Sequence, residues 1–438
     1  MVRFTGRAEA GTEQWDLVRF EVPEGVSRIT VSRAYERFST PESPAPNVLD
    51  LGLIGPGGEF RGWSGGARDT FTVSASDATP GYLAGPIPPG TWAVALGPVV
   101  FAAAGMAWEI LVELGTGPSG RPFESCPAPA EVPGRGPGWY RGDLHVHTVH
   151  SDGERTPGEL AAAARARGLD FLGSSEHNTN AANRVWGASA PPGLLVLPGE
   201  EVTTRHGHWL AVGLPPDLCV DWRHRPGDGR FAALAGEVRM RGGAVVAAHP
   251  TLPVPGAAWR FGFGQVDAIE VWNGPWTVDD HFAVEVWDSL LRSGRRVTAI
   301  GNSDSHKRSD LVGLPQTAYH ADALSARAVI AALKRGRCYL AESAAVSLTY
   351  RSVLPGDTLT APAEVTAEIE GAPGTILTLH TARGTVAARH VPSSGRAAVT
   401  WRAADPAELF VRAEARLPEP AATTFSRLVA LANPVWIS

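Results

Sequence analysis

The sequence predicts an α/β protein in which a central parallel β/α domain lies between two smaller β domains. Between about residues 139 and 345, helical stretches that end in glycine are repeatedly followed by short apolar strands, an order typical of parallel β/α folds. In residues 1–115 and 346–438, apolar and polar residues alternate instead, as in antiparallel sheets. Residues 116–138 are rich in proline and glycine, and they predict a linker before the central domain.

The first domain, residues 1–115, is expected to be an antiparallel β-sandwich. Runs such as VSRITV (26–31) and TWAVALG (91–97) place alternate residues on one face of a strand. The breakers GPGG (55–58) and PIPPG (86–90) separate these runs at turns. Short alternating strands between turn signals are typical of β-sandwiches.

In the central domain, the stretch TPGELAAAARARG predicts a helix. Thr156 is placed to cap it, Pro157 takes the first helical position, and Glu159 follows the cap by three residues. Gly168 is suited to end the helix, and the apolar stretch LDFLG follows at once. AVVAA, VTAIG and RCYLA later follow helical segments in the same way. Strands this apolar are expected where both faces of a sheet are covered.

The last part of the chain, residues 346–438, returns to alternation. Val365, Ala367 and Ile369 share one face of a predicted strand. We expect a small β domain there, or a β extension packed on the central domain, and we find no cluster of catalytic groups in it.

Composition narrows the classes of partner. The formal net charge of −6 gives no general attraction to a long nucleic acid or to an anionic membrane. The start of the chain has no apolar core of signal-peptide length, and no uncharged apolar run of about 18 residues occurs. Three distant cysteines make a disulfide framework unexpected. We therefore expect a cytoplasmic protein with a small-molecule substrate, and the sequence does not predict an oligomeric state.

Residue types that bind metal ions follow the central strands one after another. They are Asp143, His145, His147 and Asp152, then Glu176 and His177, then Glu200, Glu201, His206 and His208, then His249, then Glu270 and Asn273, then Asp304 and His306. In parallel β/α folds, ligands gather at the carboxyl ends of the strands. We therefore expect many of these side chains to meet in one pocket.

The residue types indicate which ions would fit. Imidazole and carboxylate ligands without cysteine suit zinc, manganese or iron in a site that is not purely structural. On an extended segment His145 and His147 point to the same side, and Asp304 and His306 repeat this spacing. Glu201 could bridge two ions, although Glu200 beside it leaves the register open.

Each residue also has an ordinary explanation when it is taken alone. His249 could be a satisfied polar residue at a strand end, and Asp304 with His306 could cap a helix. It is the repetition at successive strand ends that favours a joint metal site. The histidines expected on the surface are His150, His206, His224, His281 and His320.

The stretches that carry these residues resemble the motifs of a known family. DLHVHTVHSDG, SSEHNT, LPGEEVTT followed by GHWLAVG, AAHP, EVWNG and GNSDSH are similar, in order and spacing, to the successive motifs of the PHP superfamily, named for polymerase and histidinol phosphatase. The resemblance spans residues 139–345. The N-terminal β domain and the EVWNG motif further resemble the carbaryl-hydrolase-like branch of that superfamily.

The resemblance implies a distorted (β/α)7 barrel that holds two or three divalent ions, which would be manganese, zinc or iron. The implied ligands of a first ion, also the implied catalytic set, are His145, His147, Glu201 and Asp304. Those of a second ion are Glu201, His208 and His249. Those of a third ion are Asp152, His177 and His306. The chain departs from the family pattern at Glu176, where the family usually has Asp, and at Asn178, where the family frequently has Asp.

The function that this resemblance implies is a metal-dependent phosphoesterase. A metal-bound hydroxide would attack a small phosphomonoester or phosphodiester. Arg205, Asn273, Lys307 and Arg308 lie in or beside the motifs and are predicted to bind the substrate. Two alternatives stay open: hydrolysis of a carbamate, ester or amide by the same hydroxide, and an inactive metal barrel that serves as a binding module. Basic residues in the pocket would favour the phosphoester, and an apolar aromatic pocket would favour the carbonyl substrate.

Overall fold

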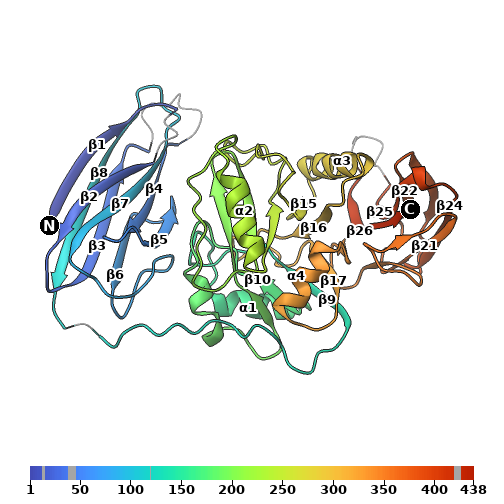
Figure 1. Ribbon diagram of the computed structural model, residues 1–438, viewed down its shortest axis with the longest axis horizontal. Coiled ribbons are helices and arrows are strands. Elements are labelled where there is room, and N and C mark those ends of the chain that lie inside the picture. The colour runs from blue at the N-terminus through green and yellow to red at the C-terminus, as the bar shows by residue number, and fades with distance from the viewer. Residues whose placement is uncertain (12–14, 38–45, 119, 419–425) are drawn as a thin grey trace.

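The computed structural model describes residues 1–11, 15–37, 46–118, 120–418 and 426–438. Three regions follow one another along the long axis of the molecule: an N-terminal region of strands, a central region that contains the helices, and a C-terminal region of strands (Figure 1). In the described residues, no helix is long and apolar enough to cross a membrane.

The N-terminal region consists of two antiparallel sheets of four strands each. In spatial order, the first contains β1 (Val2–Ala8), β8 (Met106–Thr116), β3 (Val26–Tyr35) and β6 (Thr70–Ser74). The second contains β2 (Asp16–Val22), β7 (Gly90–Val99), β4 (Val48–Ile54) and β5 (Phe60–Gly65). Alternate apolar residues of both sheets, such as Ile29 and Val31 of β3 with Leu49 and Leu51 of β4, are buried in one shared core.

Four α-helices are present in the described part of the chain. They are α1 (Pro157–Ala166), α2 (Arg230–Met240), α3 (Val278–Arg292) and α4 (Ala326–Lys334). The predicted start of α1 is confirmed, because Thr156 and Glu159 form a reciprocal capping box. Leu160, Ala161 and Ala164 form the buried face of this helix.

The central strands form two hydrogen-bonded sheets. One runs through β11 (Leu195–Leu197), β10 (Phe171–Gly173), β9 (Gly138–Asp143), β17 (Gln316–Ala321) and β18 (Cys338–Ala341). The other runs through β12 (Gly199–Thr204), β13 (Gly207–Val212), β14 (Ala244–Ala247), β15 (Ala268–Asn273) and β16 (Thr298–Asn302). The pairs β9–β10, β10–β11, β14–β15 and β15–β16 are parallel, as the helix–strand alternation predicts.

The expected (β/α)7 barrel is not evident in the described residues. β12 and β13 are antiparallel and are joined by a tight turn at Arg205 and His206, which leaves no room for a helix. A parallel connection needs a crossover of about a dozen residues or more. β9 also pairs with β17 in the antiparallel sense, so the central region has mixed sheets with few helices.

The C-terminal strands extend the first central sheet. β26 (Leu428–Ile437) pairs with β18, and the sheet continues through β25 (Phe410–Arg416), β22 (Ile376–Thr381) and β23 (Gly384–His390), while β20 (Thr358–Leu359) pairs with β26. A separate sheet contains β19 (Ser347–Tyr350), β21 (Ala363–Glu370) and β24 (Ala397–Ala403). The predicted apolar face of β21, with Val365, Ala367 and Ile369, is buried.

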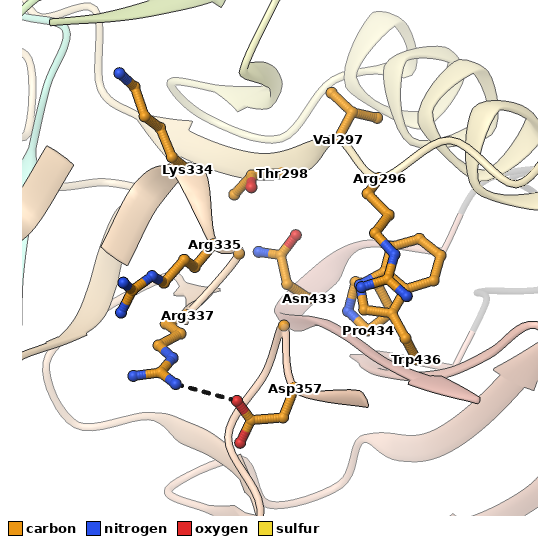
Figure 2. Close-up of a pocket in the computed structure, with 12 residues that line it drawn as sticks. Arg296, Val297, Thr298, Lys334, Arg335, Arg337, Asp357, Asn433, Pro434 and Trp436 are labelled. Atoms are coloured by element: carbon orange, nitrogen blue, oxygen red, sulfur yellow. Dashed lines mark hydrogen bonds and ion pairs between the residues drawn. The ribbon is translucent and has the colours of Figure 1, made fainter. Parts of the chain in front are cut away.

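A cavity of about 240 Å³ lies where the central and C-terminal regions meet (Figure 2). Arg296 stacks over the ring of Trp436, with its guanidinium carbon 4.8 Å from the ring centroid, and Arg337 pairs with Asp357 at 3.2 Å. The cavity borders Thr298, the first residue of β16. It therefore lies at the opposite end of β16 from Asp304.

Candidate metal centre

The segment after β9 lies alongside the segment after β16. The amide of His147 donates to the carbonyl of Ser305 (3.0 Å), and the amide of Asp304 donates to the carbonyl of His145 (2.9 Å). Val146, between the two histidines, is buried on the opposite side at 1% exposure. The two i, i+2 pairs of the sequence are thus brought together by backbone hydrogen bonds.

The first group of donor atoms belongs to His145, His147, Glu201 and Asp304. Nε2 of His145 lies 3.3 Å from Glu201 Oε2 and 3.2 Å from Asp304 Oδ1. Nε2 of His147 lies 3.4 Å from the same glutamate oxygen and 3.0 Å from the same aspartate oxygen. The two histidines and Glu201 are completely buried, and the side chain of Asp304 is 17% exposed.

These four atoms fit a metal ion. Among the described residues none of them makes a hydrogen bond of good geometry, although Oε2 of Glu201 lies 2.7 Å from Nδ1 of His177. A buried polar atom without a partner costs about 1–3 kcal/mol, so four in one place call for a ligand. Four ligand atoms about 2.0–2.2 Å from a tetrahedral ion lie about 3.3–3.6 Å from one another, close to the spacing found here.

Glu201 also reaches a second group of donor atoms. Its other oxygen, Oε1, lies 3.0 Å from Nδ1 of His208 on β13 and 3.2 Å from Nε2 of His249 after β14. Oε1 therefore faces His208 and His249, whereas Oε2 faces His145, His147 and also Nδ1 of His177 at 2.7 Å. This is the arrangement of a carboxylate that bridges two ions.

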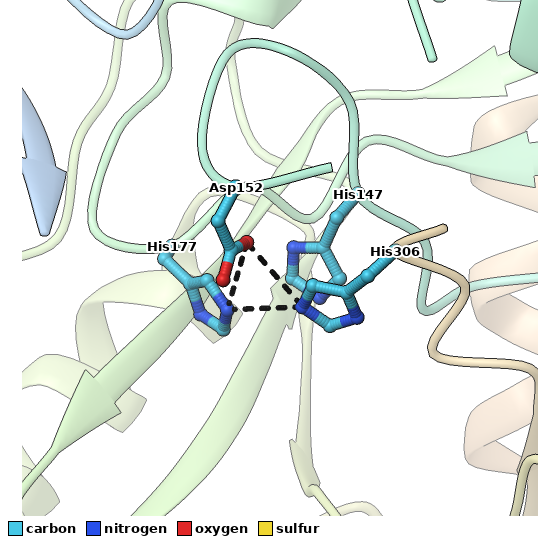
Figure 3. Close-up of side chains that lie close together, drawn as sticks. All are labelled: His147, Asp152, His177 and His306. Carbon is cyan, nitrogen blue, oxygen red and sulfur yellow. Dashed lines mark hydrogen bonds and ion pairs between the residues drawn. The ribbon is translucent and has the colours of Figure 1, made fainter. Parts of the chain in front are cut away.

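A third group of donor atoms lies beside the first (Figure 3). Oδ1 of Asp152 lies 3.4 Å from Nε2 of His177 and 3.3 Å from Nε2 of His306, and these two nitrogens are 3.4 Å apart. The ring of His147 packs against both imidazoles, with centroids 4.3 Å from His177 and 4.1 Å from His306. All nine residues expected to ligate ions thus lie in three adjoining groups.

Glu270, one of the metal-binding residue types that follow the central strands, supports the first group from behind. Both of its oxygens lie 3.2 Å from Nδ1 of His145, the ring nitrogen that faces away from the donor group. Nδ2 of Asn302 donates to Oε1 of Glu270 at 2.7 Å. A carboxylate in this position fixes the orientation of a metal-binding imidazole and raises its basicity. The signal for it in the sequence is a single acid inside the apolar strand AIEVW.

Glu176, which precedes His177, supports the loop after His147. Its carboxylate accepts hydrogen bonds from the Thr148 amide (3.1 Å), the Thr148 hydroxyl and the Ser151 hydroxyl (2.5 Å). Burial raises the pKa of Glu176, and the hydroxyl donors partly oppose that rise. Its side chain therefore shapes the loop that leads to Asp152, while His177 next to it provides the donor nitrogen.

The backbone conformation is unusual at two residues of the donor groups. His249 has φ of 26° and Asp304 has φ of 48°, in the left-handed region that costs energy for residues other than glycine. Strain of this kind is retained at functional sites when the surrounding structure enforces it. Both residues belong to the donor groups, so the strain coincides with the candidate site.

Burial and neighbouring charges set the protonation of the donors. Burial, together with the charges of His306 and His177, lowers the pKa of His147 to about 3, so this ring is neutral. Burial opposes charge on Glu201 and on Asp304, but the adjacent histidines hold the pKa of each carboxyl well below its usual range. Burial likewise opposes charge on His177, but Glu201 and Asp152 raise its pKa to about 10.

The structure places Glu201, and not Glu200, among the histidines. The Glu200 carboxylate points to the other face of β12, where it accepts from the Val220 amide at 2.8 Å. Burial raises the pKa of Glu200 to about 8. The register that the sequence left open is therefore the one in which Glu201 faces the donor groups.

The four residues predicted to bind substrate are placed differently from one another. Asn273 lies in the centre, where its amide nitrogen donates to Glu270 (3.0 Å) and Asp304 (3.3 Å). The structure does not bring the three basic residues into the donor groups. Arg205 lies over the ring of Trp15 at 5.2 Å, Lys307 is exposed, and Arg308 pairs with Glu159 of α1 at 2.7 Å. Their contact with substrate stays a prediction.

A pocket of about 570 Å³ adjoins Asp304. Its lining residues are Leu252, Asn273, Gly274, Pro275, Thr277, Asp279, Ser303, Asp304, Ser309, Asp310, Leu311 and Leu314. None of them is basic, several are apolar, and Asp279 and Asp310 are acidic. The pocket therefore suits a neutral or cationic group beside the donor atoms.

Comparisons with known proteins give distant similarities. No protein-family model and no curated protein matches the chain. Among solved structures, it is similar to a two-domain protein containing a predicted PHP-like metal-dependent phosphoesterase from Bacteroides vulgatus, with 17% identity and a TM-score of 0.40 over 72% of this chain and 100% of the other. It is also similar to an amidohydrolase from Chromobacterium violaceum, with 18% identity and a TM-score of 0.28 over 39% of this chain and 89% of the other. Both scores are low, so the functional assignment depends on the side chains described above.

Proposed function

We propose that this protein is a metal-dependent hydrolase of the PHP type and that its substrate is a small phosphoester. The observation that carries the proposal is the bridging position of Glu201, whose two oxygens face His145 and His147 on one side and His208 and His249 on the other. Bound divalent ions at such a centre would activate water and neutralise charge on the attacked group. This is the chemistry that hydrolysis of a phosphoester requires.

The charge of the site favours an anionic substrate. Two or three divalent ions bring more positive charge than Asp152, Glu201 and Asp304 can neutralise. A phosphoryl group would offset that excess through its oxygens. Because no basic residue lines the pocket beside Asp304, the ions themselves are the main counter-charge for the phosphate.

The protein side chains hold and orient this centre. Glu270 fixes the ring of His145 and, together with Asn302, keeps it in one position. Asn273 donates to Asp304 Oδ2 and leaves Oδ1 directed at the two histidines. The pocket beside Asp304 would receive the leaving group, which we expect to be small and uncharged or cationic.

A second candidate is hydrolysis of a carbamate, ester or amide. The same centre can act on a carbonyl carbon, and the resemblance to the carbaryl-hydrolase-like branch implies this chemistry. The specific observation in its favour is the pocket beside Asp304, which has apolar walls at Leu252, Leu311 and Leu314 and no basic residue.

The two candidates are separated by a substrate panel. Purified protein reconstituted with manganese or zinc would be assayed on aryl phosphates, aryl phosphodiesters and aryl carbamates. We expect the highest kcat/KM on a phosphoester, and loss of turnover and of bound metal in Asp304→Ala. A preference for the carbamates would favour the second candidate. Bound metal without turnover on any substrate would favour the binding module instead.

A further inference from the structure

The loop that carries Asp152 has an exposed donor at its end. Residues 148–153 follow His147 and lead toward α1. The side chain of Asp152 is 44% exposed, more than that of the other donors His306 (28%) and His177 (21%). In the described part of the chain, its hydrogen-bond and ion-pair partners are those two histidines alone. The position of its carboxylate therefore depends on how the loop backbone is held.

The loop is held on its outer side by a residue of the N-terminal region. Arg68, in the turn between β5 and β6, donates from Nη1 to the carbonyl of Ser151 (2.9 Å) and from Nη2 to the carbonyl of Val149. The guanidinium thus spans His150 and fixes the backbone immediately before Asp152. Arginine is suited to this contact because its planar fork presents two donors at a fixed spacing.

Gly81, also in the N-terminal region, touches the loops of two donors of the third group. Its amide donates to Nδ1 of His150 (3.4 Å), and its carbonyl accepts from the hydroxyl of Thr179, two residues after His177. Its φ is 96°, and a Cβ atom there would lie 2.6 Å from the carbonyl oxygen of His150. Only glycine allows this close approach.

Large aromatic residues pack the two regions together. Trp63 of β5 and Trp222 of the central region have ring centroids 4.7 Å apart, and both are almost completely buried. Phe60 packs edge-on against Trp222 with its centroid at 5.0 Å. A buried aromatic contact of this kind is typical of a permanent interface rather than a transient one.

From these contacts we infer that the N-terminal region completes the third donor group, with Arg68 as the positioning residue for Asp152. The inference rests on the proposed metal centre. The first two groups do not need Arg68, because their residues are largely buried in the central region, where Glu270 contacts Nδ1 of His145 and accepts from the amide of His249. Loss of Arg68 should therefore lower the affinity of the third group for its ion and leave the binding of the other ions unchanged.

The test is Arg68→Ala in the full-length chain, with the affinity and number of bound manganese or zinc ions measured by titration and elemental analysis. We expect the affinity for one ion to fall about 10- to 100-fold, as for other residues that orient ligands, while the remaining ions are retained. Hydrogen exchange of residues 148–153 should increase. Arg68→Lys should give an intermediate affinity, because one ammonium does not reproduce the two-pronged contact.

Arg37→Ala is the matched control, since Arg37 pairs with Asp69 next to Arg68 and does not touch the loop. It should leave all ions in place. Unchanged ion number and affinity in Arg68→Ala would overturn the inference, and so would simultaneous loss of every ion. If Arg68→Ala does not fold, Arg68→Lys with the same measurements decides the matter. A wild-type protein that binds no divalent ion would instead contradict the proposed function itself.

Discussion

Glu200 and Glu201 are neighbours in the chain and have opposite environments. Because successive side chains of a strand point to opposite faces, only one of them can face the donor groups. Glu201 does so, and the histidines around it lower its pKa although it is buried. Glu200 is buried without such histidines, and its burial raises its pKa to about 8. The pair therefore offers a comparison in which nearly identical substitutions should have different effects.

Glu201→Gln should reduce metal affinity by more than about 100-fold and abolish turnover, because it removes the charge of the bridging ligand. Glu200→Gln should retain both. Elemental analysis and kcat/KM on an aryl phosphate check the two variants side by side. The reverse ranking would show that Glu200 is the bridging residue.

Glu270→Gln should lower metal affinity about 10- to 100-fold without unfolding the protein, because His145 loses the charge that orients it. The matched control is Asp267→Asn, just before the other end of β15, where the carboxylate pairs with Arg239. Metal titration distinguishes them. Equal affinities in the two variants would mean that Glu270 has only a packing role.

Metal binding at the third group should strengthen as pH rises. Burial disfavours charge on His177 and His306, but nearby carboxylates raise the pKa of the first to about 10 and of the second to about 9. Both rings therefore hold a proton at neutral pH in the metal-free protein, and an ion must displace it. Affinity should be weakest in acid, increase through pH 7–9 and level off above about pH 10. Calorimetric titration in buffers of different ionisation enthalpy would count the released protons, and a pH-independent affinity would contradict the expectation.

At the scale of elements, the sequence predicted strand ends better than strand partners. The residues that follow β9, β10, β11, β14 and β16 were recognised because polar residues of metal-binding types come directly after each of these short strands. The antiparallel pairing of β9 with β17 and the hairpin of β12 with β13 were not predicted. Pairing depends on contacts between residues far apart in the chain, which a local pattern of hydrophobicity does not contain.

The segment that closes the pocket beside Asp304 should control the charge of the leaving group. Leu311 is exposed and lines this pocket together with the acidic Asp310. Leu311→Arg should raise kcat/KM several-fold for aryl phosphates that carry a carboxylate on the ring, because the pocket gains a positive charge. Activity on the uncharged parent compound serves as the control. An equal change for both compounds would show that the pocket does not contact the leaving group.

At the scale of the whole molecule, the candidate site depends on residues from distant parts of the chain. The ligand types could be read from the sequence because most of them come soon after a short apolar stretch. The contacts of Arg68 and Gly81 with the loop before Asp152 could not, since they arise where the N-terminal region meets the central region. The ion pair of Arg308 with Glu159 was missed because these two residues of the central region are far apart in the chain.

Removing the ions should destabilise the whole protein. Ions that bind the folded but not the unfolded chain add about 2.7 kcal/mol of stability at 100 times their Kd. Without the ions, the negative charges of Glu201 and Asp304 are balanced only by the neighbouring histidines. A chelator should therefore lower Tm by about 5–10 °C, and added manganese or zinc should restore it. Differential scanning calorimetry checks this, and an unchanged Tm would argue against a metal centre.

β26 joins the central sheet beside β18, although more than 80 residues separate the end of one strand from the start of the other. At about 5–20 residues per second, several seconds of synthesis pass before that partner emerges from the ribosome. During this time β18 exposes an open edge to other nascent chains. Chaperone capture is therefore expected to matter most while the C-terminal region is being translated.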